Sequence, residues 1–264
     1  MRTVVCFVAV LACGLCLASP ETVTLEGILW EPTLDAEFRT DASGLTGTKL
    51  TPTDLNWDPT TETYGAHIRL SFFGLAICRL SYHSLFFEGT TTLSQNIVVD
   101  NYVFLAGTSF HSSLLMERYG LGVLAPLIPL PVVKINLGVY LGATRYILRG
   151  TGTVLALPPR QETVTIDTYM PIAAPMLEVT ARIPGIRWLS GIASVAFIAY
   201  NEKDQKVGRY LRIKAALRFA PGPIFAAEAG FLSQSTDYED KDPNEGFKFH
   251  EVTTGFFCGV TVSF

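Results

Sequence analysis

The chain has 264 residues, of which 48% are hydrophobic and only 17% are charged, and its formal net charge is −4. A soluble domain usually has about a quarter of its residues charged, so this chain is short of charge. The mean hydropathy of +0.31 points the same way. The mild negative charge and the lack of a basic cluster argue against nucleic acid as a partner.

The first residues predict a secretory signal peptide. Met1 to Thr3 form a short positive head, and Val4 to Leu17 form an apolar run that ends in small residues. We expect cleavage after Ala18, which makes residues 1–18 the signal peptide and residues 19–264 the mature domain. A loose lipobox ending at Cys13 leaves lipidation as the alternative.

No transmembrane helix is expected after the signal peptide. The most apolar stretch, Leu121 to Val133, is interrupted by three prolines, which disrupt a helix interior. Only helices and closed barrels satisfy every backbone group in lipid. The exported chain is therefore either a soluble protein or a membrane-spanning barrel.

Strands with one apolar face recur along the chain with a period of two, which is typical of outer-membrane strands. The pattern predicts ten strands: residues 32–40, 62–73, 75–88, 110–124, 132–148, 170–183, 186–200, 207–219, 223–233 and 247–264. The piece Ile97 to Leu105 predicts a hairpin projecting from its loop. Eight strands result if Thr33 to Thr40 does not join the sheet and two other segments merge.

The last strand has the clearest alternation. Phe256, Cys258, Val260, Val262 and Phe264 form a wholly apolar face, and the residues between them are mostly small or polar. The linkers alternate between short Pro and Gly turns and longer polar loops. The long loops are expected at residues 40–61, 88–109, 149–168, 201–206 and 233–245. Outer-membrane barrels sort their loops by length in this way, so we predict an all-β, transmembrane, antiparallel up-and-down β-barrel.

Two segments resemble known bacterial proteins. The closing strand with its terminal Phe264 resembles the C-terminal signature that the barrel-assembly machinery of outer membranes reads. The segment Phe104 to Ser109 is similar to a recurring element of small outer-membrane barrels, and the resemblance extends over Tyr64 to Gly122 and the closing strand. It implies a place in the bacterial outer membrane, with its lipids and the assembly machinery as partners, and no defined activity.

The polar faces of the strands predict the residues that line the lumen. They are Asp35, Glu37, Arg39, His67, Arg69, Arg79, His83, Lys134, Glu178, Arg182, Arg212, Lys214, Arg218 and Glu228. A ten-stranded barrel has a narrow interior, which side chains of opposite sign largely fill. We therefore expect a salt-bridged and mostly plugged lumen.

Candidate catalytic groups are sparse. His111 lies among serines, and His250 lies beside Glu251 and near Asp237. Nucleophilic catalysis needs a base and a third orienting group in fixed geometry, which this spacing does not supply. Asp237 to Glu245 form an acidic loop that matches no ligand spacing. We predict no catalytic residue, no metal site and no cofactor.

The sequence thus predicts a non-enzymatic outer-membrane barrel that is structural or forms a narrow passage for small solutes, hydrophobic ones included. A surface-binding or adhesion protein acting through its outer loops is one alternative. An outer-membrane hydrolase is a second, and a soluble periplasmic β-protein is a third.

Overall fold

The computed structural model describes residues 22–41, 46–72, 76–130, 132–202, 206–240 and 247–264. The predicted signal peptide lies outside these residues. Among the described residues, no helix has the length and apolarity needed to span a bilayer. The strands are β1 (Thr22–Thr40), β2 (Thr63–Phe72), β3 (Ala76–Thr92), β4 (Ile97–Val99), β5 (Tyr102–Phe104), β6 (Ser109–Pro129), β7 (Val133–Val154), β8 (Arg160–Ile183), β9 (Ile186–Glu202), β10 (Lys206–Phe219), β11 (Phe225–Asp240) and β12 (Phe247–Ser263).

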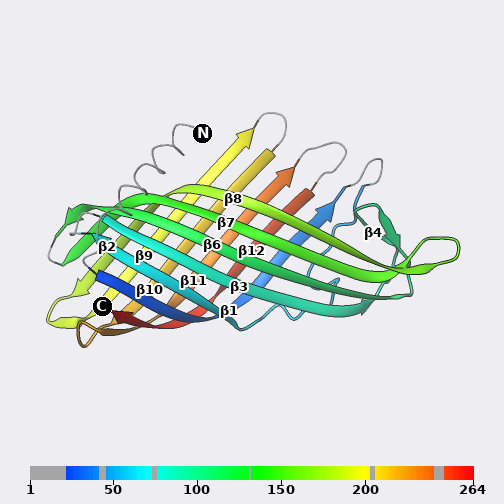
Figure 1. Ribbon diagram of the computed structural model, residues 1–264. Helices are drawn as coiled ribbons and strands as arrows, with labels where there is room; N and C mark the ends of the chain where they lie inside the picture. Colours follow the sequence, from blue (N-terminus) through cyan, green and yellow to red (C-terminus); the bar gives the residue numbers. More distant parts are fainter. Residues whose placement is uncertain (1–21, 42–45, 73–75, 131, 203–205, 241–246) are drawn as a thin grey trace.

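Ten of these strands close into an antiparallel barrel (Figure 1). Neighbours in the barrel are neighbours in sequence, β1 pairs with β12 from Thr24↔Ser263 to Thr40↔Phe247, and β7 pairs with β8 along its whole length. Among the described residues each of the ten barrel strands has a paired strand on both sides, and β2 covers β1 and β3 only over their parts nearer the chain's ends in the barrel, Thr22–Trp30 and Ala76–His83. The predicted ten-stranded barrel is confirmed, and β4 and β5 form the expected hairpin, which joins β7 at Phe104↔Val154.

The two ends of the barrel differ. β1 begins and β12 ends at one end, where Val23 and Phe264 exchange two backbone hydrogen bonds of 3.2 and 2.8 Å. Short connections such as the one at Gly185 lie at this end, which we call the turn end. The opposite end, the loop end, carries the segment of residues 46–62 and the β4–β5 hairpin.

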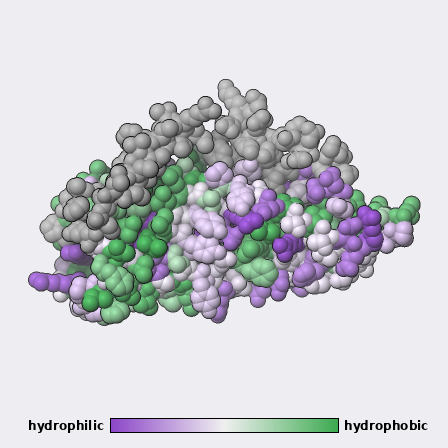
Figure 2. Space-filling model, in the orientation of Figure 1, coloured by the Kyte–Doolittle hydropathy of each residue, from purple (hydrophilic) through white to green (hydrophobic). Residues whose placement is uncertain are grey.

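An apolar belt surrounds the barrel near the turn end. On β12, the outward side chains of Phe256 and Val260 are 77% and 62% exposed, while the inward Phe257 is buried. Phe225 and Leu217 are similarly exposed on β11 and β10. Figure 2 shows hydrophobic residues gathered on the half of the molecule that carries the C-terminus, and more hydrophilic ones towards the other half. A continuous exposed apolar surface of this extent is stable against lipid and not against water.

A row of outward polar side chains lies at the edge of this belt that is nearer the loop end. Arg145 on β7 donates to Asp167 on β8 at 2.7 and 3.0 Å and to Glu117 on β6 at 3.4 Å. Tyr82 donates to Glu117 at 3.3 Å, and the Arg145 guanidinium lies 5.3 Å from the ring centre of Tyr169. Tyrosines beside charged groups are typical of a membrane–water interface.

The barrel wall continues well beyond this row. β6, β7 and β8 have 21, 22 and 24 residues, whereas about 9–11 residues suffice to cross a bilayer. About half of each of these three strands therefore lies beyond the belt, and Figure 1 shows them extending far towards the loop end.

The projecting wall overturns one prediction about the lumen. Asp35, Glu37 and Arg39 point outward, while Leu34 and Phe38 point inward and are buried. Beyond the belt the wall is surrounded by water, so polar side chains face out and apolar ones pack inside. Along β1 from the turn end to the loop end, the outward face therefore changes from apolar to polar and the inward face from polar to apolar.

Asp41 follows directly after β1 at the loop end. The Arg39 guanidinium donates hydrogen bonds to its carboxylate, at 2.9 and 2.7 Å, and the Gly47 amide donates a third at 2.8 Å. These bonds favour the charged form and hold the pKa of Asp41 below its usual value.

Two predicted loops are also wrong. Most of residues 149–168 belong to β7 and β8, which are joined by a short connection after Val154, and β11 continues to Asp240. Gly150 and Gly152 face inward in β7 and leave room for the Phe110 ring. An added Cβ would lie 2.6 Å from that ring at Gly150 and 2.8 Å at Gly152.

We predict that Val260→Arg in the belt destabilises the barrel by about 2–4 kcal/mol, because it places a charge in lipid. Urea unfolding in phospholipid vesicles measures this loss. Thr33→Arg is the control, since Thr33 faces outward beyond the belt and should change stability little. Equal effects of the two substitutions would contradict the position of the belt.

Candidate functional site

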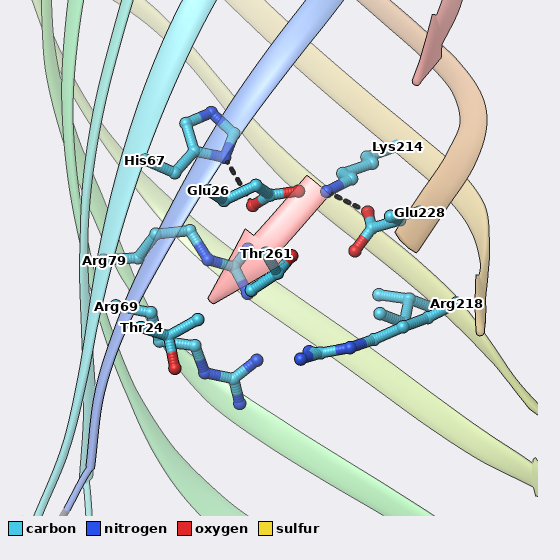
Figure 3. Close-up of a pocket in the computed structure, with 10 residues that line it drawn as sticks. Thr24, Glu26, His67, Arg69, Arg79, Lys214, Arg218, Glu228 and Thr261 are labelled. Atoms are coloured by element: carbon cyan, nitrogen blue, oxygen red, sulfur yellow. Dashed lines mark hydrogen bonds and ion pairs between the residues drawn. The ribbon is translucent and has the colours of Figure 1, made fainter. Parts of the chain in front are cut away.

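Ion pairs fill the interior at the level of the belt (Figure 3). Arg79 on β3 donates to Glu178 on β8 at 2.7 Å, across the lumen. Lys214 and Glu228 form an ion pair between the neighbouring strands β10 and β11. Charges buried in a narrow interior need such partners, because isolated burial is costly.

A chain of polar side chains continues from this layer towards the loop end. Glu26 on β1 lies 3.0 Å from His67 Nδ1, and His67 Nε2 lies 3.0 Å from His83 Nε2. Both histidines are buried. The chain holds β1, β2 and β3 together from inside the barrel.

Arg118 and Glu251 form a further buried ion pair between β6 and β12. The Arg118 guanidinium also donates to Thr253 Oγ1 at 2.9 Å and lies 5.9 Å from the ring centre of Trp30. Glu251 and Thr253 have no measurable exposure, so this pair is closed off from water.

Aromatic rings separate the charges. Tyr140 and Tyr210 stack with ring centres 5.8 Å apart, and the Arg212 guanidinium lies 5.4 Å from the centre of Tyr140. The Lys214 ammonium lies 4.8 Å from the centre of Phe257. Such contacts stabilise cations that have lost their water.

The structure places the predicted lumen residues in three groups. His67, His83, Glu178, Arg212, Lys214 and Glu228 face inward and are buried, and Arg69, Arg79 and Arg218 face inward with partial exposure. Lys134 and Arg182 lie on the inward face but are exposed at the turn end. Asp35, Glu37 and Arg39 lie outside the barrel, as described above.

Three charged residues that face the lumen were missed by the sequence analysis. Glu26 precedes the first predicted strand, which begins ten residues later than β1. Arg118 lies in a segment whose alternation is less clean, and Glu251 was considered only as a partner of His250. Extending the alternation of the closing strand from Phe257 back to Glu251 would have placed Glu251 inside.

A second layer closes the interior at the loop end. Trp57, from the segment before β2, is buried and donates from Nε1 to Ser112 Oγ at 2.9 Å. Its ring lies 5.6 Å from that of Phe38, which lies 5.0 Å from Phe249. Leu55 from the same segment is also buried, so this layer is apolar.

The two layers leave little space. In the described part of the barrel, the interior holds a cavity of about 20 Å³ in the charged layer and one of about 10 Å³ in the apolar layer. Each is close to the space that a single water molecule needs. The larger hollows, of about 520 and 560 Å³, lie on the outward apolar face formed by β8 to β12 and the neighbouring β1.

The candidate catalytic histidines lie on the outer wall. His111 is exposed with Nδ1 3.1 Å from Thr90 Oγ1, whereas Ser112 points inward to Trp57. His250 contacts Asp237. Within the described residues neither histidine is hydrogen-bonded to a serine, and no group of three or more potential metal ligands is found.

No protein-family model matches the chain, and no curated protein matches it in sequence. The crystal structure of the outer membrane protease OmpT from Escherichia coli is similar, with a TM-score of 0.60 at 10% identity over 93% of this chain and 97% of that one. The translocator domain of the autotransporter NalP from Neisseria meningitidis matches with a TM-score of 0.40, 10% identity and coverages of 97% and 95%. The toluene transporter TodX from Pseudomonas putida matches with a TM-score of 0.38 and 8% identity, over 93% of this chain and 90% of that one. The closed sheet and the similarity to OmpT give the chain the fold of an outer-membrane β-barrel, and the identity of 10% leaves its particular activity open.

We predict that Glu178→Gln costs about 3–5 kcal/mol of stability, because Arg79 then lacks its buried carboxylate. Urea unfolding of the protein in detergent micelles measures the loss. Asp167→Asn is the matched control: it removes the carboxylate of the outward Arg145 pair, which is exposed to solvent and should contribute little to stability. A loss at Glu178 no larger than the loss at Asp167 would show that the interior pair is exposed to water.

Proposed function

We propose that this protein is a closed outer-membrane β-barrel, a structural element that spans the membrane without forming a diffusion pore and presents its projecting half at the cell surface. The closed sheet, the apolar belt and the similarity of fold to an outer-membrane protease support the location. In this proposal the turn end faces the periplasm and the loop end faces outward.

The observation that carries the proposal is the double closure of the interior. The charged layer and the apolar layer lie at different heights in the barrel, and in the described part of the chain they enclose cavities of about 20 and about 10 Å³, each close to the space of one water molecule. A passage for solutes would require both layers to separate. We therefore favour the structural role over the narrow passage.

The expected partners follow from the surface. Outer-membrane lipids would contact the belt, and the barrel-assembly machinery would read the closing strand. Phe264 suits that role because its side chain is 74% exposed while its backbone is hydrogen-bonded to Val23. We propose no catalytic role.

We predict that the protein shows no stable conductance steps in planar bilayers in which an open porin gives large steps. The variant Leu55→Ala/Trp57→Ala should stay closed as well, because it opens the apolar layer alone and leaves the charged layer in place. Large, stable steps from the unmodified protein would contradict the proposal.

A surface-binding role is the second candidate, and one feature favours it. The connection between β7 and β8, at the outermost tip of the projecting wall, exposes Leu157 completely and Leu155 to 66%. Large apolar side chains standing free at a tip in water are typical of contact sites. In this role the barrel would carry an apolar tip to a partner surface.

We predict that Leu155→Ser/Leu157→Ser lowers the adhesion of bacteria displaying the protein to cultured cells by several-fold, while the protein stays folded by heat-modifiable gel migration. Leu130→Ser is the control, because Leu130 is similarly exposed but lies at the turn end. Unchanged adhesion of the tip variant would exclude this tip as the contact.

A further inference from the structure

The cavity in the charged layer has an unusual lining. Four cationic side chains, Arg69, Arg79, Lys214 and Arg218, line it together with Glu26 and Glu228 (Figure 3). The cations come from β2, β3 and β10, so they reach the cavity from opposite walls of the barrel.

Two of these four cations, Arg69 and Arg218, do not take part in the ion pairs of this layer. Glu178 binds Arg79 and Glu228 binds Lys214, while Glu26 is hydrogen-bonded to His67, which carries a charge only when protonated. The layer therefore holds four cations against three carboxylates. Among the described residues, no carboxylate lies within ion-pair distance of Arg69 or Arg218. Figure 3 shows their guanidinium groups directed towards each other across the cavity.

The register of the sheet makes this arrangement costly. Arg69 on β2 is directly paired with Arg79 on β3, and both point inward. Like charges opposite each other on one face destabilise a sheet, and a guanidinium that points into the lumen without a direct ion pair adds a desolvation cost. Arg218 is paired in register with Glu228, but the carboxylate of Glu228 binds Lys214. An excess of positive charge in a narrow lumen needs an anion to balance it.

We propose that this cavity binds one small inorganic anion of the size of chloride between Arg69 and Arg218. The volume of about 20 Å³ suits a single atom or water-sized group and is too small for phosphate or for a lipid head group. Thr24 and Thr261 also line the cavity and supply hydroxyl donors. Glu26 and Glu228 line it too, on the side where His67 and Lys214 contact them, and Figure 3 shows the guanidinium groups of Arg69 and Arg218 on the other side.

Bound chloride would join β2 to β10 across the lumen, so it would stabilise the folded barrel by mass action. At a chloride concentration about ten times its Kd, the folding equilibrium constant rises about tenfold. The proposal concerns this one cavity and is independent of whether the barrel conducts.

The test is urea unfolding of the full mature protein in detergent micelles, with sodium chloride, bromide or gluconate at constant ionic strength. Chloride and bromide should stabilise the barrel saturably, and gluconate, which is too large for the cavity, should not. Arg69→Gln and Arg218→Gln should each abolish the difference between the salts. Lys134→Gln, which removes an exposed cation from the same end of the barrel, should keep it.

A second result separates anion binding from a failure to fold. Arg69→Gln relieves the repulsion with Arg79, so in gluconate it should be at least as stable as the unmodified protein. Crystals soaked in bromide should show an anomalous peak between Arg69 and Arg218. Equal unfolding in chloride and gluconate, an equal loss of the chloride effect in Lys134→Gln, or no peak at saturating bromide would each overturn the proposal.

Discussion

A strand inside a lipid bilayer must have every backbone N–H and C=O group hydrogen-bonded within the protein, because lipid offers no partners. The pairing of β1 with β12 meets this requirement, since it joins the ends of the chain and removes both edges of the sheet. The apolar belt, the two ends and the narrow interior all depend on this closure. Without it, β1 and β12 would each present a row of unpaired groups to lipid.

Closure also determines the chemistry of the interior. A ten-stranded barrel is narrow, so inward side chains from opposite walls meet, as Arg79 and Glu178 do. At the loop end, the rings of Phe38, Trp57 and Phe249 fill the narrow interior in place of ion pairs. The two layers differ because the surroundings of the wall differ. Polar residues lie inside the barrel where lipid surrounds the wall, and apolar residues lie inside where water surrounds it.

The strands and their order could be predicted from the sequence because alternation and Pro or Gly turns are local signals. The direction of Asp35 and Glu37 could not be predicted, because side chains alternate with a period of two whichever face of the strand points into the barrel. Which face points inward depends on whether lipid or water surrounds the wall, and the sequence of β1 does not indicate where the lipid ends. The partners of Arg118 and Arg79 depend on how the closed sheet brings distant strands together across the lumen, which no local pattern contains.

The two interior layers resist opening for different physical reasons. The apolar layer around Trp57 is held by burial, which is non-directional and tolerates small shifts. The charged layer is held by specific partners, and removal of one leaves an unpaired charge in a poorly hydrated space. That layer is therefore the more sensitive of the two, and its charge balance matters most where Arg69 and Arg218 face each other with no carboxylate of the described residues within ion-pair distance. An anion at that point would complete the same pairing rule that organises the rest of the lumen.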